Sequence, residues 1–258
     1  MKSLKDKNVP EQAIQTLEIV KELLGSSLIG MYLYGSAVNG GLRKNSDLDI
    51  LVVANQSLPV FKRKVLTDRF MQISGKVGNP DSLRPIEVTI VNHQDIVPWQ
   101  YPPKKEYIYG EWLRDEYEQG KIQEPTDDPD LAIVLAKARK YNISLWGADL
   151  SNIIEPVSIA DIHKAIKDSL PALIQEIKGD ERNVILTLAR MWQTMMPCEI
   201  TPKDVVAAWA IPRLPKEHAT LLDMARKAYR GEYEDKWEEL EREVKALVYF
   251  MKNAIESC

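Results

Sequence analysis

The sequence is poor in the residues that mark several common protein classes. Its 258 residues include two cysteines, Cys198 and Cys258, which are too few and too far apart for a disulfide framework and lack the spacing of metal ligands. The three histidines also lack ligand spacing. No run of about 18 apolar residues occurs and the first residues contain no apolar signal-peptide core, so the sequence predicts a cytoplasmic protein that does not span a membrane.

An excess of basic charge is missing as well. Lysine and arginine together number 34 and aspartate and glutamate 38, which gives a formal net charge of −4. Proteins that bind nucleic acids through phosphate contacts carry a basic surface, so nucleic acid is not an expected partner. The length suits two domains of modest size, and we expect a monomer.

The most informative motif is a Gly-Ser pair followed eleven residues later by Asp-x-Asp. The apolar segment 28–34 predicts a buried strand that ends at Gly35-Ser36. A glycine there lets the backbone approach a ligand closely, and the serine offers a hydroxyl and an amide to phosphate oxygens. The segment 47–54 (DLDILVVA) predicts a second strand, which the polar Ser46 precedes.

Alternate residues of a strand point to the same face, so Asp47 and Asp49 are expected to project their carboxylates together. Two such charges need a cation, and oxygen ligands beside a phosphate-binding turn suit Mg²⁺ with a nucleoside triphosphate such as ATP. The segment 85–91 (PIEVTIV) predicts a third strand, on which Glu87 could complete a three-carboxylate site. The residues alone leave two roles open for Glu87, a third metal ligand or a general base.

This pattern resembles the nucleotidyltransferase superfamily, in which Gly-Ser precedes Asp-x-Asp and a third acidic residue lies on a neighbouring strand. The resemblance extends over nearly the whole chain to the bacterial aminoglycoside nucleotidyltransferases, in the segments YLYGSAVNGGLRKNSDLDILV, PIEVTIV, VPWQYPPKKEYIYGEWLR, GDERNVILTLARMWQT and ITPKDVVAAWA. Within that family the likeness is greater to the enzymes that use Mg²⁺ and ATP to transfer AMP to the 9-hydroxyl of spectinomycin, which confers resistance, than to those that also modify streptomycin.

The resemblance implies roles for individual residues. It implies that Glu87 is the general base and also contacts the metal. It implies that Arg190 and Lys203 bind the ATP phosphates and that Tyr229 contacts the base. The full ATP site implied in this way consists of Gly35, Ser36, Ser46, Asp47, Asp49, Arg190, Lys203 and Tyr229.

A cationic drug that is rich in hydroxyl groups needs carboxylates and a flat apolar wall in its pocket. Trp112 and Asp180 match segments that line the drug pocket in the family, and Glu87 would meet the drug hydroxyl. From the residues alone, Trp112 could equally be a core side chain and Asp180 a helix cap.

The chain changes character near its middle. Strands and helices alternate up to about residue 110, whereas nearly every segment after Asp130 has helical periodicity. We therefore predict an α/β nucleotidyltransferase domain with a mixed β-sheet over residues 1–155 and an all-α helical bundle over residues 156–258 that closes the nucleotide and drug cleft. The predicted helices are 59–73, one from Ser158 with a kink or break at Pro171, one opened by Thr201-Pro202, 215–230 and 234–256.

Other functions remain open. A dual-specificity streptomycin and spectinomycin enzyme is one, although the connection before Gly179 is shorter here than in those enzymes by about two residues; Glu176 and Trp112 argue the other way. An RNA-directed nucleotidyltransferase predicts a basic stripe that this acidic chain lacks. A non-catalytic nucleotide-binding module would be expected to lack one of the three carboxylates, and all are present.

Overall fold

The computed structural model describes residues 9–43, 46–76, 83–175, 177–196, 203–234 and 236–258. It divides into two compact units, which we call unit 1 and unit 2, at the peptide bond between Ser158 and Ile159. Among the described residues, no helix combines the length and apolar character that crossing a membrane requires.

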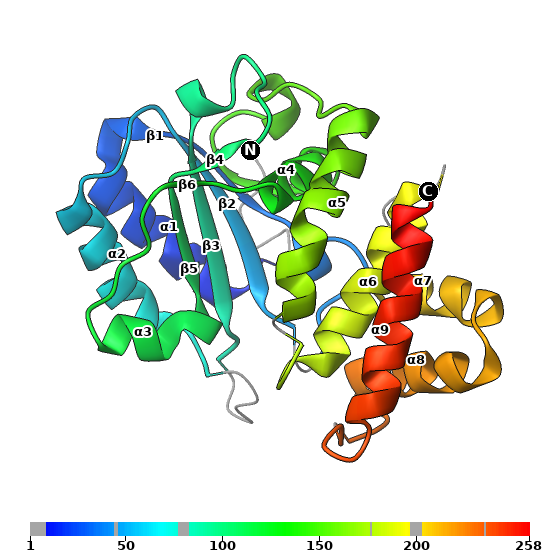
Figure 1. Ribbon diagram of the computed structural model, residues 1–258. Coiled ribbons are helices and arrows are strands. Elements are labelled where there is room, and N and C mark those ends of the chain that lie inside the picture. The colour runs from blue at the N-terminus through cyan, green and yellow to red at the C-terminus, as the bar shows by residue number, and fades with distance from the viewer. Residues whose placement is uncertain (1–8, 44–45, 77–82, 176, 197–202, 235) are drawn as a thin grey trace. The chain divides into compact units, whose positions relative to one another are not determined.

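Unit 1 is built on a mixed β-sheet (Figure 1). Within the described residues, the sheet has five strands in the order β5 (Tyr107–Gly110), β3 (Ile86–Asn92), β2 (Leu48–Ala54), β1 (Leu28–Leu33) and β7 (Ile143–Trp146). Strands β2 and β3 run parallel, and the other neighbours are antiparallel. The predicted α/β fold with a mixed sheet is confirmed. A separate two-stranded sheet pairs β4 (Lys104–Lys105) with β6 (Thr126–Asp127).

Both faces of the large sheet are buried, each against different helices. The face that carries Ile50 and Val88 packs on α1 (Glu11–Leu24) and α2 (Val60–Ile73). The opposite face, which carries Leu51, packs on α4 (Asp130–Lys140). Figure 1 shows α1 and α2 on one side of the strands and α4 on the other. The short helix α3 (Arg114–Glu118) follows β5.

Strand β7 is an exception to the prediction that nearly every segment after Asp130 is helical, and the sequence analysis did not identify it. Residues Ile143–Trp146 pair antiparallel with β1 and form one edge of the sheet. A strand of four residues is too short for its apolar alternation to be distinguished from a helical period, and its conformation depends on the ladder with β1.

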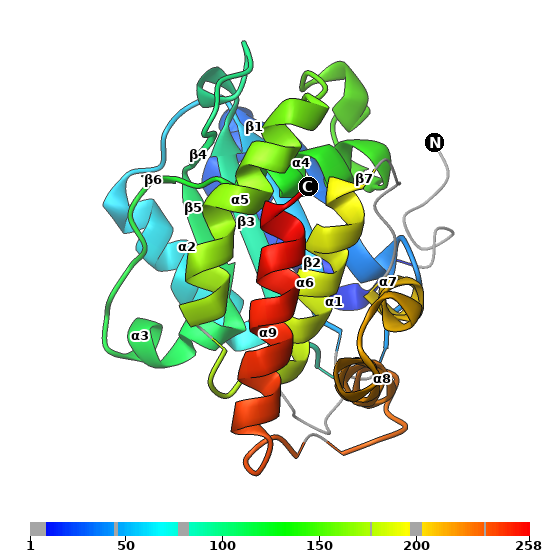
Figure 2. The same cartoon turned by 45° about the vertical axis from the view of Figure 1, so that its right-hand side comes forward.

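Every regular element described in unit 2 is helical, which confirms the predicted all-α region. Its α-helices are α5 (Ile159–Gln175), α6 (Glu181–Met195), α7 (Lys203–Ala210), α8 (Lys216–Tyr229) and α9 (Glu241–Glu256). Helix α6 packs against each of the others and is central to the unit. Figure 2 shows α6 and α9 side by side.

Two details of the helical prediction can be compared with the structure. Of the two outcomes expected at Pro171, a kink or a break, the break does not occur: helix α5 continues through Pro171, and the packing of the neighbouring buried Leu170 favours continuation of the helix. The start predicted for the last helix was wrong: it begins at Glu241 rather than at residue 234, and the buried Trp237 lies in the irregular segment before it. The predicted cap at Thr201-Pro202 lies outside the described residues.

Candidate active site

Three carboxylates meet at one end of the sheet. Asp49 and Glu87 are Cα partners in the parallel ladder of β2 and β3, so their side chains lie on the same face. Asp47 lies two residues before Asp49, directly ahead of β2. One carboxylate oxygen from each of the three residues lies within 4.8 Å of the other two, and all three side chains are half-buried. The structure therefore brings together the three carboxylates that the sequence analysis selected.

The turn after β1 is shaped around Asp49. The backbone N–H of Tyr34 donates to the carbonyl oxygen of Asp49 at 3.0 Å. Gly35 has a φ of +68°, and a Cβ atom at this position would overlap with the carboxylate of Asp49. Glycine is required here both for its backbone conformation and for the space beside the carboxylate.

Ser36 follows in the same turn. Its Oγ atom is buried and has no hydrogen-bond partner among the residues that the structure describes. A buried hydroxyl without a partner costs free energy, which a ligand oxygen in hydrogen-bond reach would recover. The turn therefore has the donor that a phosphate group requires.

The electrostatic environment of Glu87 is unusual. Its pKa lies well above the ordinary value, first because of burial and then because of the negative charges of Asp49, Asp47 and Asp130, whereas Lys137 lowers it. Neighbouring carboxylates disfavour one another's ionised form, and a bound cation would reverse that effect. The cluster is thus suited to hold either a proton or a divalent cation.

Tyr34 and helix α4 contribute residues that the sequence analysis missed. The Tyr34 hydroxyl donates to Oε1 of Glu87 at 3.5 Å. On α4, the Nζ atom of Lys137 lies 5.8 Å from the centroid of the Tyr34 ring. Burial raises the pKa of Tyr34 well above its usual value, and Glu87 and Asp49 add to the effect. A polar hydroxyl directly before Gly35-Ser36 was the available signal for Tyr34, whereas nothing in the sequence placed α4 beside the carboxylates.

Trp112 lies beside Glu87. In the antiparallel ladder of β3 and β5, Glu87 pairs with Gly110, so a side chain at residue 110 would share the face of Glu87. The indole of Trp112 occupies that position, because a Cβ atom on Gly110 would overlap with its ring. The Trp112 side chain is 56 % exposed, which is not the exposure of a core residue. It forms an apolar surface next to the acidic cluster.

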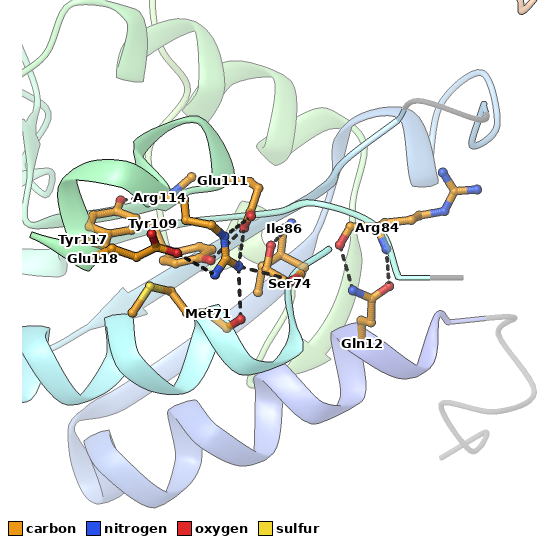
Figure 3. A network of polar contacts seen from close by, with 11 residues as sticks. Gln12, Met71, Ser74, Arg84, Ile86, Tyr109, Glu111, Arg114, Tyr117 and Glu118 are labelled. Atoms are coloured by element: carbon orange, nitrogen blue, oxygen red, sulfur yellow. Dashed lines mark hydrogen bonds and ion pairs between the residues drawn. The ribbon is translucent and has the colours of Figure 1, made fainter. Parts of the chain in front are cut away.

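A buried ion pair fixes the end of β5 that leads to Trp112 (Figure 3). The guanidinium of Arg114 contacts the buried carboxylate of Glu111 and donates to the carbonyl oxygens of Met71 at 3.1 Å and Ser74 at 3.4 Å. The Tyr109 hydroxyl donates to the same carboxylate at 2.9 Å. Because Met71 belongs to α2, this network ties β5 to the helix behind the sheet.

The start of β3 and the turn before Asp47 are fixed by a second set of contacts. The side-chain amide of Gln12 bonds both backbone groups of Arg84, as Figure 3 shows, at 2.8 and 2.9 Å. The Arg84 guanidinium donates to the carbonyl oxygens of Arg43 at 2.6 Å and Ser46 at 3.0 Å. The Ser46 hydroxyl accepts from the Arg43 N–H at 3.0 Å. Ser46 thus closes the turn that leads into Asp47.

The remaining predicted site residues belong to unit 2. Lys203 is the first residue of α7, and Tyr229 is the last residue of α8. Arg190 lies in α6, half-buried and without an ion pair among the described residues. Asp180 occupies the position before α6 but its side chain caps no backbone N–H of the helix; it accepts from the Asn183 amide at 2.6 Å. Residue 176 lies outside the described residues.

Comparison with known proteins covers both units. Residues 13–113 match the nucleotidyltransferase domain family, and residues 152–254 match the C-terminal domain family of aminoglycoside adenylyltransferases. The chain is 67 % identical over 257 residues to spectinomycin 9-adenylyltransferase from Staphylococcus aureus, with 100 % of this chain and 99 % of the relative covered. The chain belongs to the aminoglycoside adenylyltransferase family. It is therefore an enzyme of the nucleotidyltransferase class, as predicted.

Two further relatives agree with this membership. A spectinomycin 9-adenylyltransferase from Campylobacter jejuni is 49 % identical, with 96 % of this chain and 95 % of the relative covered. The crystal structure of the spectinomycin adenyltransferase AAD(9) from Enterococcus faecalis with ATP and spectinomycin superposes with a TM-score of 0.91 at 38 % identity, covering 95 % of this chain and 98 % of that chain. The predicted fold, an α/β nucleotidyltransferase domain followed by an all-α region, is therefore the fold of its family.

Proposed function

We propose that the enzyme transfers AMP from ATP to the 9-hydroxyl of spectinomycin and thereby confers resistance to the drug. The observation that carries the proposal is the meeting of Asp47, Asp49 and Glu87 next to the Gly35-Ser36 turn. The activity named for the relatives supports spectinomycin as the acceptor.

The acidic cluster fits Mg²⁺ as the metal. Its donors are carboxylate oxygens, which this cation prefers, and they lie within 4.8 Å of one another. We assign Asp47 and Asp49 as ligands, with Glu87 as a further contact. When bound, Mg²⁺ would neutralise charge on the triphosphate of ATP as pyrophosphate leaves.

We assign the other roles in the reaction to further residues of unit 1. The unpartnered Ser36 hydroxyl donates to a phosphate oxygen, and Gly35 allows the backbone to approach it. Glu87 accepts the proton of the drug hydroxyl while that oxygen forms a bond to the α-phosphorus and the bond to pyrophosphate breaks. In the metal-free cluster the pKa of Glu87 is raised, which favours the protonated form; a bound Mg²⁺ would lower it and keep the carboxylate ionised, so that it can accept the proton. The exposed indole of Trp112 supports the drug next to Glu87.

The assignments in unit 2 rest on the family resemblance. We propose that Arg190 and Lys203 bind the phosphates, that Tyr229 contacts the adenine, and that Asp180 meets a cationic group of the drug. The exposed carboxylate of Asp180 and the half-buried guanidinium of Arg190 are compatible with these roles. We further propose residues 1–155 and 156–258 as the two domains of a monomer that acts in the cytoplasm, where ATP is available.

Replacement of Glu87 by glutamine tests the proposal. Glu87→Gln keeps the shape of the side chain and removes the base, so turnover should fall by roughly two to four orders of magnitude while ATP and drug still bind. Pyrophosphate release with spectinomycin measures turnover, and calorimetry measures binding. Glu18→Gln, on the exposed side of α1, is the matched control and should behave as the wild type. Turnover near the wild-type rate in Glu87→Gln would refute the assignment.

A further inference from the structure

Tyr34 lies between the acidic cluster and α4, and the proposed function gives it no role. We infer that Tyr34 is a positioning residue for Glu87: its hydroxyl holds one carboxylate oxygen so that the other faces the acceptor hydroxyl of the substrate. This inference rests on the proposed role of Glu87 as the general base.

The Tyr34 side chain is buried, and packing and a backbone hydrogen bond restrain its position. Its ring is 2 % exposed and packs in the cluster formed by Leu51, Leu131 and Leu135. Its backbone N–H donates to the carbonyl oxygen of Asp49, so the residue is tied to the strand that carries Asp49. A hydroxyl on such a ring has a fixed direction, which is what a positioning donor requires.

The contact with Glu87 has the right chemistry. A phenol is protonated at neutral pH, so it donates and the carboxylate accepts. The distance of 3.5 Å between the two oxygens is long, as catalytic hydrogen bonds often are before substrate binds. The ammonium group of Lys137 lies 5.8 Å from the centroid of the Tyr34 ring, and its attraction to the ring face helps to hold the ring in place.

Glu87 needs such a donor because its neighbours repel it. Asp47 and Asp49 would push an ionised Glu87 away from the cluster, and a glutamate side chain has three torsions through which it can swing. A displacement of about 1 Å costs roughly 100-fold in rate when a reacting group must be aligned. The Tyr34 hydroxyl opposes that displacement from the side of the sheet on which α4 lies.

Tyr32 provides a matched control. It lies two residues before Tyr34 and is also buried, and its hydroxyl donates to the carbonyl oxygen of Ala148 at 2.8 Å; within the described part of the chain it makes no hydrogen bond to Asp47, Asp49 or Glu87. Tyr32→Phe and Tyr34→Phe each delete one buried hydroxyl and retain the ring. We expect Tyr34→Phe to lower kcat by about 10- to 100-fold with little change in KM for ATP or spectinomycin, because outer partners of functional carboxylates have effects of this size. Tyr32→Phe should leave kcat and KM near the wild-type values.

A double-mutant cycle decides whether Tyr34 acts through Glu87. In the Glu87→Gln background, Tyr34→Phe should cause no further loss of turnover. An additive loss, an unchanged kcat in Tyr34→Phe alone, or an equal loss in Tyr32→Phe would overturn the inference. So would a Tyr34→Phe protein that is not recovered folded, since the hydroxyl would then serve stability. Full turnover in Glu87→Gln alone would refute the base role of Glu87, on which the inference rests. Absence of pyrophosphate release from the wild type with ATP and spectinomycin would refute the proposed function, so the failures are distinguishable.

Discussion

Gly35→Ala is the substitution whose effect the structure defines most directly. The added methyl group would meet two obstacles, a backbone with a φ of +68° and the carboxylate of Asp49 in the space that the methyl would occupy. Gly120→Ala meets only the first, because Gly120 has a φ of +78° and no atom of the described residues lies within 4 Å of the added Cβ. Comparison of the two variants separates the effect of backbone strain from the effect of displacing Asp49, the proposed metal ligand.

The two substitutions should differ in stability. Alanine in the left-handed region costs about 1–2 kcal/mol, and the loss of unfolded-chain entropy offsets about 0.4–1 kcal/mol of it. Gly120→Ala should therefore lower the free energy of unfolding by up to about 1.5 kcal/mol. Gly35→Ala adds the overlap with Asp49, for which crowded sites lose about 1–3 kcal/mol more. Each kcal/mol corresponds to roughly 2–4 °C in Tm for a protein of this size.

The two substitutions should also differ in activity. Asp49 must move or rotate to admit the methyl group, so we expect Gly35→Ala to lose at least about 100-fold in kcat/KM, whereas Gly120→Ala should retain wild-type activity. Thermal unfolding and pyrophosphate release with spectinomycin measure the two quantities. Wild-type activity in a folded Gly35→Ala protein would show that the close approach of Gly35 to Asp49 has no part in catalysis.

Three further results are expected. Asp49→Asn should abolish the Mg²⁺ dependence of ATP binding in calorimetry, and an undiminished dependence would exclude Asp49 as a ligand. In metal-free protein, folding raises the pKa of Glu87 above its value in the unfolded chain, about 4.3. Ionisation of Glu87 therefore destabilises the folded protein as pH rises above that value, by about 1.4 kcal/mol for each pKa unit of the shift. Glu87→Gln should thus be more stable than wild type at pH 7 but not at pH 4, and equal Tm values at pH 7 would contradict the raised pKa. Spectinomycin should be adenylylated and streptomycin, which is longer, refused; equal pyrophosphate release with both drugs would overturn that specificity and leave the mechanism standing.

The strands that carry the site could be predicted because each combines an apolar run with a clear end. The predicted segments 28–34, 47–54 and 85–91 correspond to β1 (Leu28–Leu33), β2 (Leu48–Ala54) and β3 (Ile86–Asn92). Strand β7 was missed because it is four residues long and owes its conformation to pairing with β1, more than a hundred positions earlier in the chain. Local pattern thus predicted the long elements, and non-local pairing determined the short one.

The same limit applies to the site. Asp47 and Asp49 could be selected because their spacing fixes a common face, and Glu87 because it lies on the next strand. That Asp49 and Glu87 are direct partners depends on the register of the parallel ladder, which no short segment specifies. Lys137 comes close to Tyr34 only because α4 packs on that face of the sheet, so its position followed from tertiary packing.

Glu87 in β3 and Glu111, which directly follows the neighbouring strand β5, show why pairing, rather than burial alone, separates a structural carboxylate from a functional one. Glu111 is buried and is matched by the guanidinium of Arg114 and the hydroxyl of Tyr109, so its charge is satisfied within the fold. Glu87 instead faces the carboxylates of Asp47 and Asp49, an arrangement that is unfavourable until a cation or a proton enters. The nearby Ser36 hydroxyl lacks a partner in the same way among the described residues. Each unsatisfied group matches one part of the proposed substrate complex: the cluster matches Mg²⁺ and an acceptor proton, and the hydroxyl matches a phosphate oxygen. Because folding leaves these groups unsatisfied in one place, ligand binding should stabilise unit 1 more than the contact area alone would suggest.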